Sequence, residues 1–151
     1  MIEKLKLSIR KASKTDLKEV SEIFIEESSK KPYLQEWTKE TSLEKIRELF
    51  KKGDISIATS NIGVLGFIAC HRRCQGKDVF IDEFWVKSNY QKMGVGKALL
   101  NFIEGKCRNG EIESIALISD KKSGAFIFYK KLGYKEANQY VLMKKKLSNY
   151  A

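Results

Sequence analysis

The stretch VKSNYQKMGVGK, residues 86–97, indicates the fold of this 151-residue chain more strongly than any other part of its sequence. It has the pattern of a strand end, a short loop with two glycines and the start of a helix. The glycines let the backbone expose several N–H groups together, and the helix N-terminus adds about half a positive charge. Lys92 and Lys97 add to this field, so the segment predicts an anion site that suits a diphosphate. A plain strand-to-helix turn, with glycine for steric reasons, is the alternative.

The elements on either side of this stretch predict a parallel strand pair. Residues 79–86 precede the loop as a strand, residues 94–108 have the apolar spacing of a helix, and residues 112–119 form a second strand with an apolar centre. A right-handed crossover between two such strands makes them parallel neighbours. The loop is not a Walker A motif, because no Gly-Lys-Ser/Thr has the required spacing, and it lacks the third glycine of the dinucleotide fingerprint.

The rest of the chain adds elements in an order typical of a mixed sheet. Apolar periodicity predicts strands at 5–9, 55–58, 64–71 and 140–147, and helices that start near Ser13, Thr41 and Ser123. Thr41 and Glu44 form a capping-box pattern. No repeat or linker interrupts the chain, so we expect one domain over residues 1–151. Its class is α/β (mixed α+β), with a central mixed, mostly antiparallel sheet flanked by helices.

Composition and charge are those of a globular protein with an anionic partner. Hydrophobic residues make up 42% of the chain, and 29 Lys and Arg against 19 Asp and Glu give a net charge of +10. Such an excess suits nucleic acid, a membrane surface or a phosphate-rich cofactor. No zinc-finger or recognition-helix pattern accompanies the charge, so we do not expect nucleic acid. No apolar run reaches the roughly 18 residues that cross a bilayer, and the N-terminus lacks the apolar core of a signal peptide, so we expect no membrane partner.

The cysteines and the single histidine predict a reduced protein without a metal site. Three cysteines, Cys70, Cys74 and Cys107, cannot all pair within the chain, and a cytoplasmic protein is the simplest interpretation. Cys70, His71 and Cys74 supply at most three ligands, and the sequence has no second cluster, so we expect no metal.

Two motifs resemble those of one known family. Gln91-x-x-Gly94-x-Gly96, after a strand that ends in Val86, resembles the acetyl-CoA signature of the GNAT superfamily of N-acetyltransferases. AFIFYKKLGY, residues 125–134, resembles the C-terminal motif of the same superfamily, and the order of elements is similar from residue 5 to residue 147. The resemblance implies the GNAT-like acyl-CoA N-acyltransferase fold. It also implies acetyl-CoA as the acetyl donor and direct attack by a primary amine in a ternary complex.

The resemblance further implies which residues bind the cofactor. The loop amides would hold the CoA pyrophosphate, and the strand before the loop would part from its neighbour so that the pantetheine arm pairs with its backbone. Ser88 stands where the family often has proline, and Lys122 stands where it often has asparagine, so Asp120 or Ser123 would fill that polar role. The implied cofactor-binding residues are Phe84, Trp85, Val86, Gln91, Lys92, Met93, Gly94, Val95, Gly96, Lys97, Asp120 and Ser123.

Three residues are candidates for catalysis. The resemblance implies that Tyr129 donates a proton to the leaving thiolate, since a tyrosine can act as an acid but not as a base at neutral pH. A core tyrosine is the alternative. Asp82 and Glu83 are candidates for the base that takes a proton from the amine, and either could instead be a solvated or salt-bridged strand residue. Neighbouring strand residues point to opposite faces, so only one of them would face the acceptor unless a bulge intervenes. The resemblance favours Asp82, because family members often place a carboxylate on the face that includes positions 80, 82 and 84.

The acceptor side and the partners are also expectations from this resemblance. Glu26, Glu27 and Glu36 could offer an anionic surface to a cationic amine, and Tyr33 and Trp37 could form an aromatic wall or simply anchor their loop. Dimers are common in the resembling family, so a homodimer is a further expectation. The alternative function is a basic binding module, for nucleic acid or a protein partner, on the same fold without acetyl transfer, because fold does not fix function.

Overall fold

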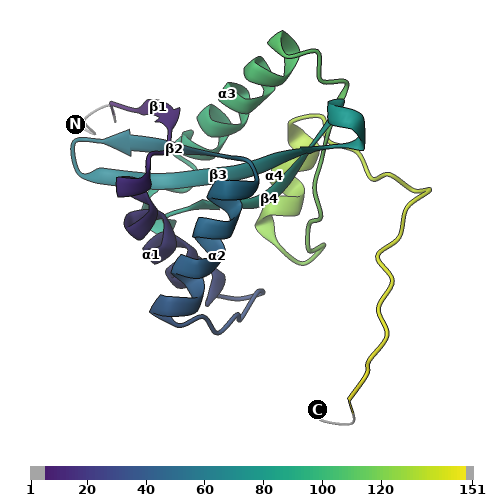
Figure 1. Cartoon of the computed structure of the whole chain (residues 1–151), viewed down its shortest axis with the longest axis horizontal. Coiled ribbons are helices and arrows are strands. Elements are labelled where there is room, and N and C mark those ends of the chain that lie inside the picture. The colour runs from purple at the N-terminus through teal and green to yellow at the C-terminus, as the bar shows by residue number, and fades with distance from the viewer. Residues whose placement is uncertain (1–5, 149–151) are drawn as a thin grey trace. The chain divides into compact units, whose positions relative to one another are not determined.

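A sheet of five strands forms the centre of the first of two compact units, 1–118 and 119–151 (Figure 1). The computed structural model describes residues 6–148. The first four strands pair antiparallel, and the last two pair in parallel, as the crossover through the intervening helix requires. The sheet therefore has the predicted mixed, mostly antiparallel arrangement. The strands follow chain order: β1 Ser8–Lys11, β2 Asp54–Ser60, β3 Gly63–Arg73, β4 Asp78–Val86 and β5 Ser114–Ala116.

Three helices cover the two faces of this sheet. α1 (Leu17–Ser28) and α2 (Lys39–Lys52) pack on one face, and α3 (Val95–Asn109) packs on the other (Figure 1). Each helix buries the apolar stripe that its sequence spacing predicts. Because both faces are covered, β3 is buried continuously over residues 64–70 rather than at alternate residues. Within the described part of the chain, no helix has the length and apolar character needed to span a membrane.

Several element boundaries differ from the sequence predictions. The N-cap of α2 is Thr38 rather than Thr41, because the Thr38 hydroxyl accepts a hydrogen bond from the Thr41 amide and the Thr41 hydroxyl accepts one from the Thr38 amide, both at 3.0 Å. The strand expected at 112–119 is shorter, since its pairing with β4 ends at Ala116. The first strand starts at Ser8, and Leu5, where it was expected to start, lies outside the described residues. Short 3₁₀ turns complete the unit: Lys14–Asp16, Cys74–Gly76 and Ser88–Tyr90.

The second unit contains α4 (Gly124–Lys131) and an extended tail. The Ser123 hydroxyl caps α4 by accepting a hydrogen bond from the Phe126 amide at 3.3 Å, and Gly133 follows the helix with φ +93°. The strand expected at 140–147 is wrong, because this segment has no regular secondary structure. Residues 140–143 are 71–85% exposed. An apolar pattern gives a segment strand propensity, but a strand forms only where a neighbouring strand pairs with it.

Candidate active site

The residues between β4 and α3, 87–94, lead directly into an open helix N-terminus, and we call them the glycine loop. A 3₁₀ turn, Ser88–Tyr90, follows β4, and Gly94 then adopts a left-handed conformation with φ +88°. A Cβ atom added to Gly94 would have no heavy atom within 4 Å, so the loop borders open space here. Glycine is therefore favoured at this position by its backbone conformation and not by crowding.

The N-terminus of α3 presents backbone amides that need an acceptor. The first helical bond runs from the Ala98 amide to the Gly94 carbonyl at 3.0 Å, so the amides of Val95, Gly96 and Lys97 have no acceptor within the helix. Among the described residues, no side chain caps this end, and its first turn contains no acidic residue. The positive end of a 15-residue helix therefore lies at the glycine loop, which suits an anion such as a diphosphate.

β5 pairs over its whole length, but only with the first three residues of β4. Their parallel ladder ends at the pair Phe80–Ala116, whereas β4 continues to Val86 and pairs with β3 as far as Gly66. Residues 81–86 of β4 therefore have no ladder with β5, which is what the expected parting of these strands requires. An extended chain can add its own hydrogen bonds to a strand edge that has no such ladder.

A β-bulge lies at the two candidate bases in β4. In the ladder with β3, Ala69 pairs with Glu83 and Cys70 pairs with Ile81, so Asp82 is the extra residue. The bulge turns Asp82 and Glu83 toward the same face of the sheet, the one that α1 and α2 cover. Asp82 contacts the last residue of α2, and Glu83 contacts a tryptophan that packs on the core beneath α1. In a regular strand, neighbouring side chains point to opposite faces of the sheet. The bulge is the exception that the sequence prediction allowed for.

The two carboxylates have different partners. Nδ1 of His71 and Oδ2 of Asp82 are hydrogen-bonded at 2.6 Å, and the Lys52 ammonium lies 3.5 Å from Oδ1 of Asp82. The Trp85 indole donates to Glu83 at 2.7 Å, yet burial raises the pKa of Glu83 above its ordinary value. Glu83 is thus the carboxyl whose surroundings favour the protonated form. Within the described part of the chain, no three His, Cys, Asp or Glu side chains are grouped as a metal site requires.

Trp85 belongs to an aromatic cluster. Its ring centroid lies 4.8 Å from that of Tyr33 and 6.1 Å from that of Phe24, and the Trp37 ring lies 5.0 Å from Phe24. These contacts favour the interpretation in which Tyr33 and Trp37 anchor the loop between α1 and α2. The Trp85 side chain faces the core, so a contact with a ligand would come from its backbone.

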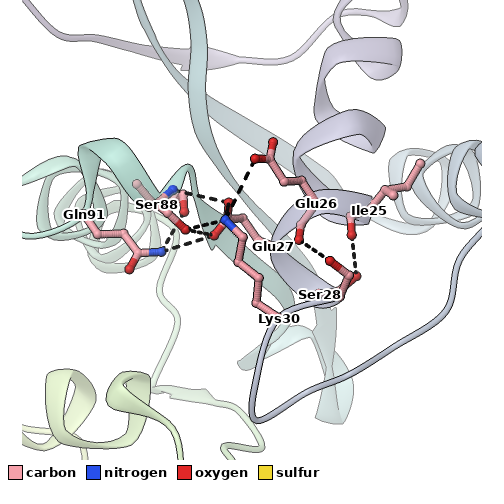
Figure 2. Close-up of polar contacts among 9 residues, drawn as sticks. Ile25, Glu26, Glu27, Ser28, Lys30, Ser88 and Gln91 are labelled. Carbon is pink, nitrogen blue, oxygen red and sulfur yellow. Dashed lines mark hydrogen bonds and ion pairs between the residues drawn. The ribbon is translucent and has the colours of Figure 1, made fainter.

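A buried glutamate of α1 holds the start of the glycine loop (Figure 2). Glu27 accepts hydrogen bonds from the Ser88 hydroxyl at 2.6 Å, from the Ser88 amide at 3.3 Å and from the Gln91 side chain at 3.5 Å. The Lys30 ammonium lies 2.9 Å from the same carboxylate. α1 is thereby tied to the loop that precedes α3.

The position of Glu27 corrects one prediction. Glu27 is only 4% exposed, so the expectation that it adds to an anionic acceptor surface is wrong, whereas Glu26 and Glu36 are exposed. The sequence does carry a signal for this. Glu27 follows Val20 and Phe24 at helical spacing, so it lies on the apolar stripe of α1, where a charge needs buried partners.

Two residues of the glycine loop are engaged in holding the loop itself. Gln91, expected to bind the cofactor, also donates to the Val86 carbonyl at 2.9 Å, so its side chain acts within the loop. Ser88, which stands where the resembling family often has proline, gives both its amide and its hydroxyl to Glu27. A proline has no amide hydrogen to give.

Tyr129, Asp120 and Ser123 lie in the second unit, and their expected roles stay predictions. Tyr129 is a buried residue of α4, with ring contacts to Phe128 and Tyr134. The Asp120 carboxylate accepts the amide two residues later at 2.7 Å, and the Asp120 carbonyl accepts the Ser123 hydroxyl at 2.7 Å. Both residues therefore shape the turn that precedes α4.

Solved structures of other proteins share this fold. A possible acetyltransferase from Clostridium difficile 630 aligns with a TM-score of 0.79 and 18% identity, over 95% of this chain and 99% of that one. An aminoglycoside N-acetyltransferase in complex with CoA aligns with a TM-score of 0.76 and 18% identity, over 98% and 99% of the two chains. Ard1 from Thermoplasma volcanium aligns with a TM-score of 0.66 and 26% identity, over 84% and 81%.

The sequence itself also matches a family. No curated protein matches it at a significant level. The family model described as an acetyltransferase (GNAT) domain matches residues 51–136, which is more than half of the chain. The chain therefore belongs to the GNAT acetyltransferase family.

Proposed function

We propose that the protein is an acetyl-CoA-dependent N-acetyltransferase that passes the acetyl group directly to a primary amine in a ternary complex. The observation that carries the proposal is the uncapped N-terminus of α3 after the glycine loop, next to the part of β4 that has no ladder with β5. Family membership, and a fold shared with a CoA-bound aminoglycoside N-acetyltransferase, support the same donor. When bound, acetyl-CoA supplies a thioester that is reactive toward an amine.

The glycine loop and the start of α3 would hold the phosphates. The amides of Val95, Gly96 and Lys97 provide hydrogen-bond donors, and the ammonium groups of Lys92 and Lys97 add positive charge. The backbone of β4 over residues 84–86 would pair with the pantetheine arm. A backbone N–H of this strand could also stabilise the negative charge that develops on the thioester oxygen.

Glu83 is the base that its surroundings support better. Burial raises its pKa, so it can take a proton from an ammonium group closer to neutral pH. Asp82 is the second candidate, because its hydrogen bond to His71 offers a path along which the proton can leave. The bulge brings both carboxylates to one face, where a cationic acceptor would meet two negative charges.

Tyr129 would protonate the leaving thiolate. This role rests on the resemblance of residues 125–134 to the family motif. It also requires that residues 1–151 form one acetyltransferase domain, as we propose. We expect Tyr129→Phe to lower turnover about 100-fold, the contribution of a positioned general acid, and to spare acetyl-CoA affinity. Thiol release measures the first quantity and titration calorimetry the second. Full turnover in the variant would remove Tyr129 from the mechanism.

Titration calorimetry with acetyl-CoA tests the proposal, with ATP as the control anion. We expect micromolar binding of acetyl-CoA that is clearly tighter than the binding of ATP, and thiol release when an accepted amine is added. Equal binding of the two ligands would reduce the glycine loop to a general anion site. In that case strongly salt-dependent binding of nucleic acid would favour the basic binding module.

A further inference from the structure

We infer that Glu27 is a positioning residue that holds the glycine loop in the conformation in which the α3 amides are open to an anion. The inference rests on the proposed function for the identity of that anion, the diphosphate of acetyl-CoA. No contact between Glu27 and a ligand is implied. Glu27 is 4% exposed, and Figure 2 shows its carboxylate in contact with Ser88, Gln91 and Lys30.

The Glu27 carboxylate keeps its donors only while the loop stays in place. A buried charge is costly unless hydrogen bonds and an opposite charge satisfy it. Ser88 and Gln91 of the loop supply the hydrogen bonds, and Lys30 supplies the charge. The Lys30 ammonium also donates to the Ser88 hydroxyl at 2.7 Å, so the three side chains hold one another. A loop that moved away would leave the carboxylate buried without two of its partners.

The conformation of the rest of the glycine loop depends on these contacts with Glu27. The Gln91 side chain joins Glu27 to the Val86 carbonyl, at the point where β4 ends. Past Gln91, both Lys92 (φ +63°) and Gly94 (φ +88°) are left-handed. A lysine rarely adopts this region, so the conformation needs contacts outside the loop to fix it. The α3 amides open to the same space only if these residues keep their geometry.

Asp16 provides a comparison within the same chain. It is also a buried carboxylate, and Arg10 binds it through two nitrogens at 2.7 and 2.9 Å while Ser13 donates its amide and hydroxyl. These donors lie three and six residues away in the sequence, whereas those of Glu27 on the loop lie 61 and 64 residues away. Loss of either carboxylate should lower stability, but only the loss of Glu27 should change the glycine loop.

The test compares Glu27→Gln with Asp16→Asn and with Glu22→Gln, an exposed position on the same helix. Hydrogen–deuterium exchange of the free protein follows residues 87–94 without any ligand, and titration calorimetry gives the affinity for acetyl-CoA. We expect Glu27→Gln to speed exchange in this loop about tenfold and to weaken acetyl-CoA binding about tenfold. Asp16→Asn should lower the melting temperature without either change, and Glu22→Gln should match the wild type.

A second variant keeps the test decisive if Glu27→Gln does not fold. Ser88→Ala changes an exposed residue and removes the hydroxyl donor while the backbone amide stays. We expect the same two effects at roughly threefold, since one of the hydrogen bonds to the carboxylate is lost.

Each other outcome has a definite meaning. Unchanged exchange of residues 87–94 in both variants would overturn the inference, and so would faster exchange with unchanged acetyl-CoA affinity. A wild-type protein that does not bind acetyl-CoA would refute the proposed function instead. Inorganic pyrophosphate then serves as the probe: weaker binding by Glu27→Gln would support the positioning role, and equal or absent binding would overturn it.

Discussion

The two halves of β4 shift the pKa of a carboxyl group in opposite directions. At the start of the strand, Asp78 accepts hydrogen bonds from the Ser114 hydroxyl at 2.6 Å and from the Arg73 guanidinium. Burial alone would raise the pKa of Asp78, but these two bonds outweigh it and lower the pKa. Beyond the bulge at Asp82, where β5 no longer pairs, burial prevails at Glu83 and raises its pKa. In the first half, the ionised Asp78 carboxylate stabilises the fold. In the second half, ionisation of Glu83 costs stability, and a raised pKa suits its proposed role as a base.

The largest expected effect is on the proposed anion site at the start of α3, which follows the second half of β4. Gly94→Glu places a negative charge at the positive end of α3 and forces a side chain onto a left-handed backbone, so we expect acetyl-CoA binding to weaken at least about 100-fold. Titration calorimetry measures the change. Gly94→Ala is the matched control, because its Cβ meets open space and it tests the backbone conformation without the charge. Wild-type affinity in Gly94→Glu would place the phosphate site elsewhere.

The next effect concerns turnover. We expect Glu83→Gln to lower turnover about 100-fold with little change in acetyl-CoA affinity, because glutamine keeps the acceptor for the Trp85 indole but cannot take a proton. Asp82→Asn is the paired variant on the same face. Thiol release with a saturating amine gives both rates. If Asp82→Asn causes the larger loss, the base is Asp82 with its His71 partner.

Local signals account for what the sequence predicts of this molecule. The helix expected to start near Ser123 is α4, and apolar spacing gives the order of elements, because helix starts and periodicity depend on a few neighbouring residues. The bulge at Asp82 is not predictable in this way, since it is defined by which residues of β3 lie opposite. The partners of Glu27 on the glycine loop lie more than 60 residues away, and only its place on an apolar stripe hints at them. Residues 140–147 fail as a strand for a related reason, because a strand depends on its neighbour.

A smaller effect is expected at the start of β4. Asp78→Asn weakens the bonds to Arg73 and Ser114, so we expect the free energy of unfolding to fall by about 2 kcal/mol. The melting temperature should fall by about 4–8 °C for a chain of this size. Ser114→Ala removes one of the bonds and should cost less. Acetyl-CoA affinity, measured well below the melting temperature, should be unchanged in both variants. A loss of affinity here would show that the two halves of the strand are not separate in function.

The smallest expected effect is on the pH dependence of stability, and its sign is opposite for Asp78 and Glu83. The lowered pKa of Asp78 stabilises the fold above the ordinary aspartate pKa, and this contribution is lost as the pH falls through the folded-state value. The raised pKa of Glu83 leaves stability intact below the ordinary glutamate pKa and removes it as the pH rises through the folded-state value. Between about pH 7 and about pH 3, the deficit of Asp78→Asn relative to the wild type should therefore shrink, and Glu83→Gln should lose an advantage that it holds at neutral pH. Denaturant unfolding at a series of pH values measures both differences. If Glu83→Gln is less stable than the wild type at neutral pH, the burial of Glu83 carries no cost, and the contrast between the halves does not hold.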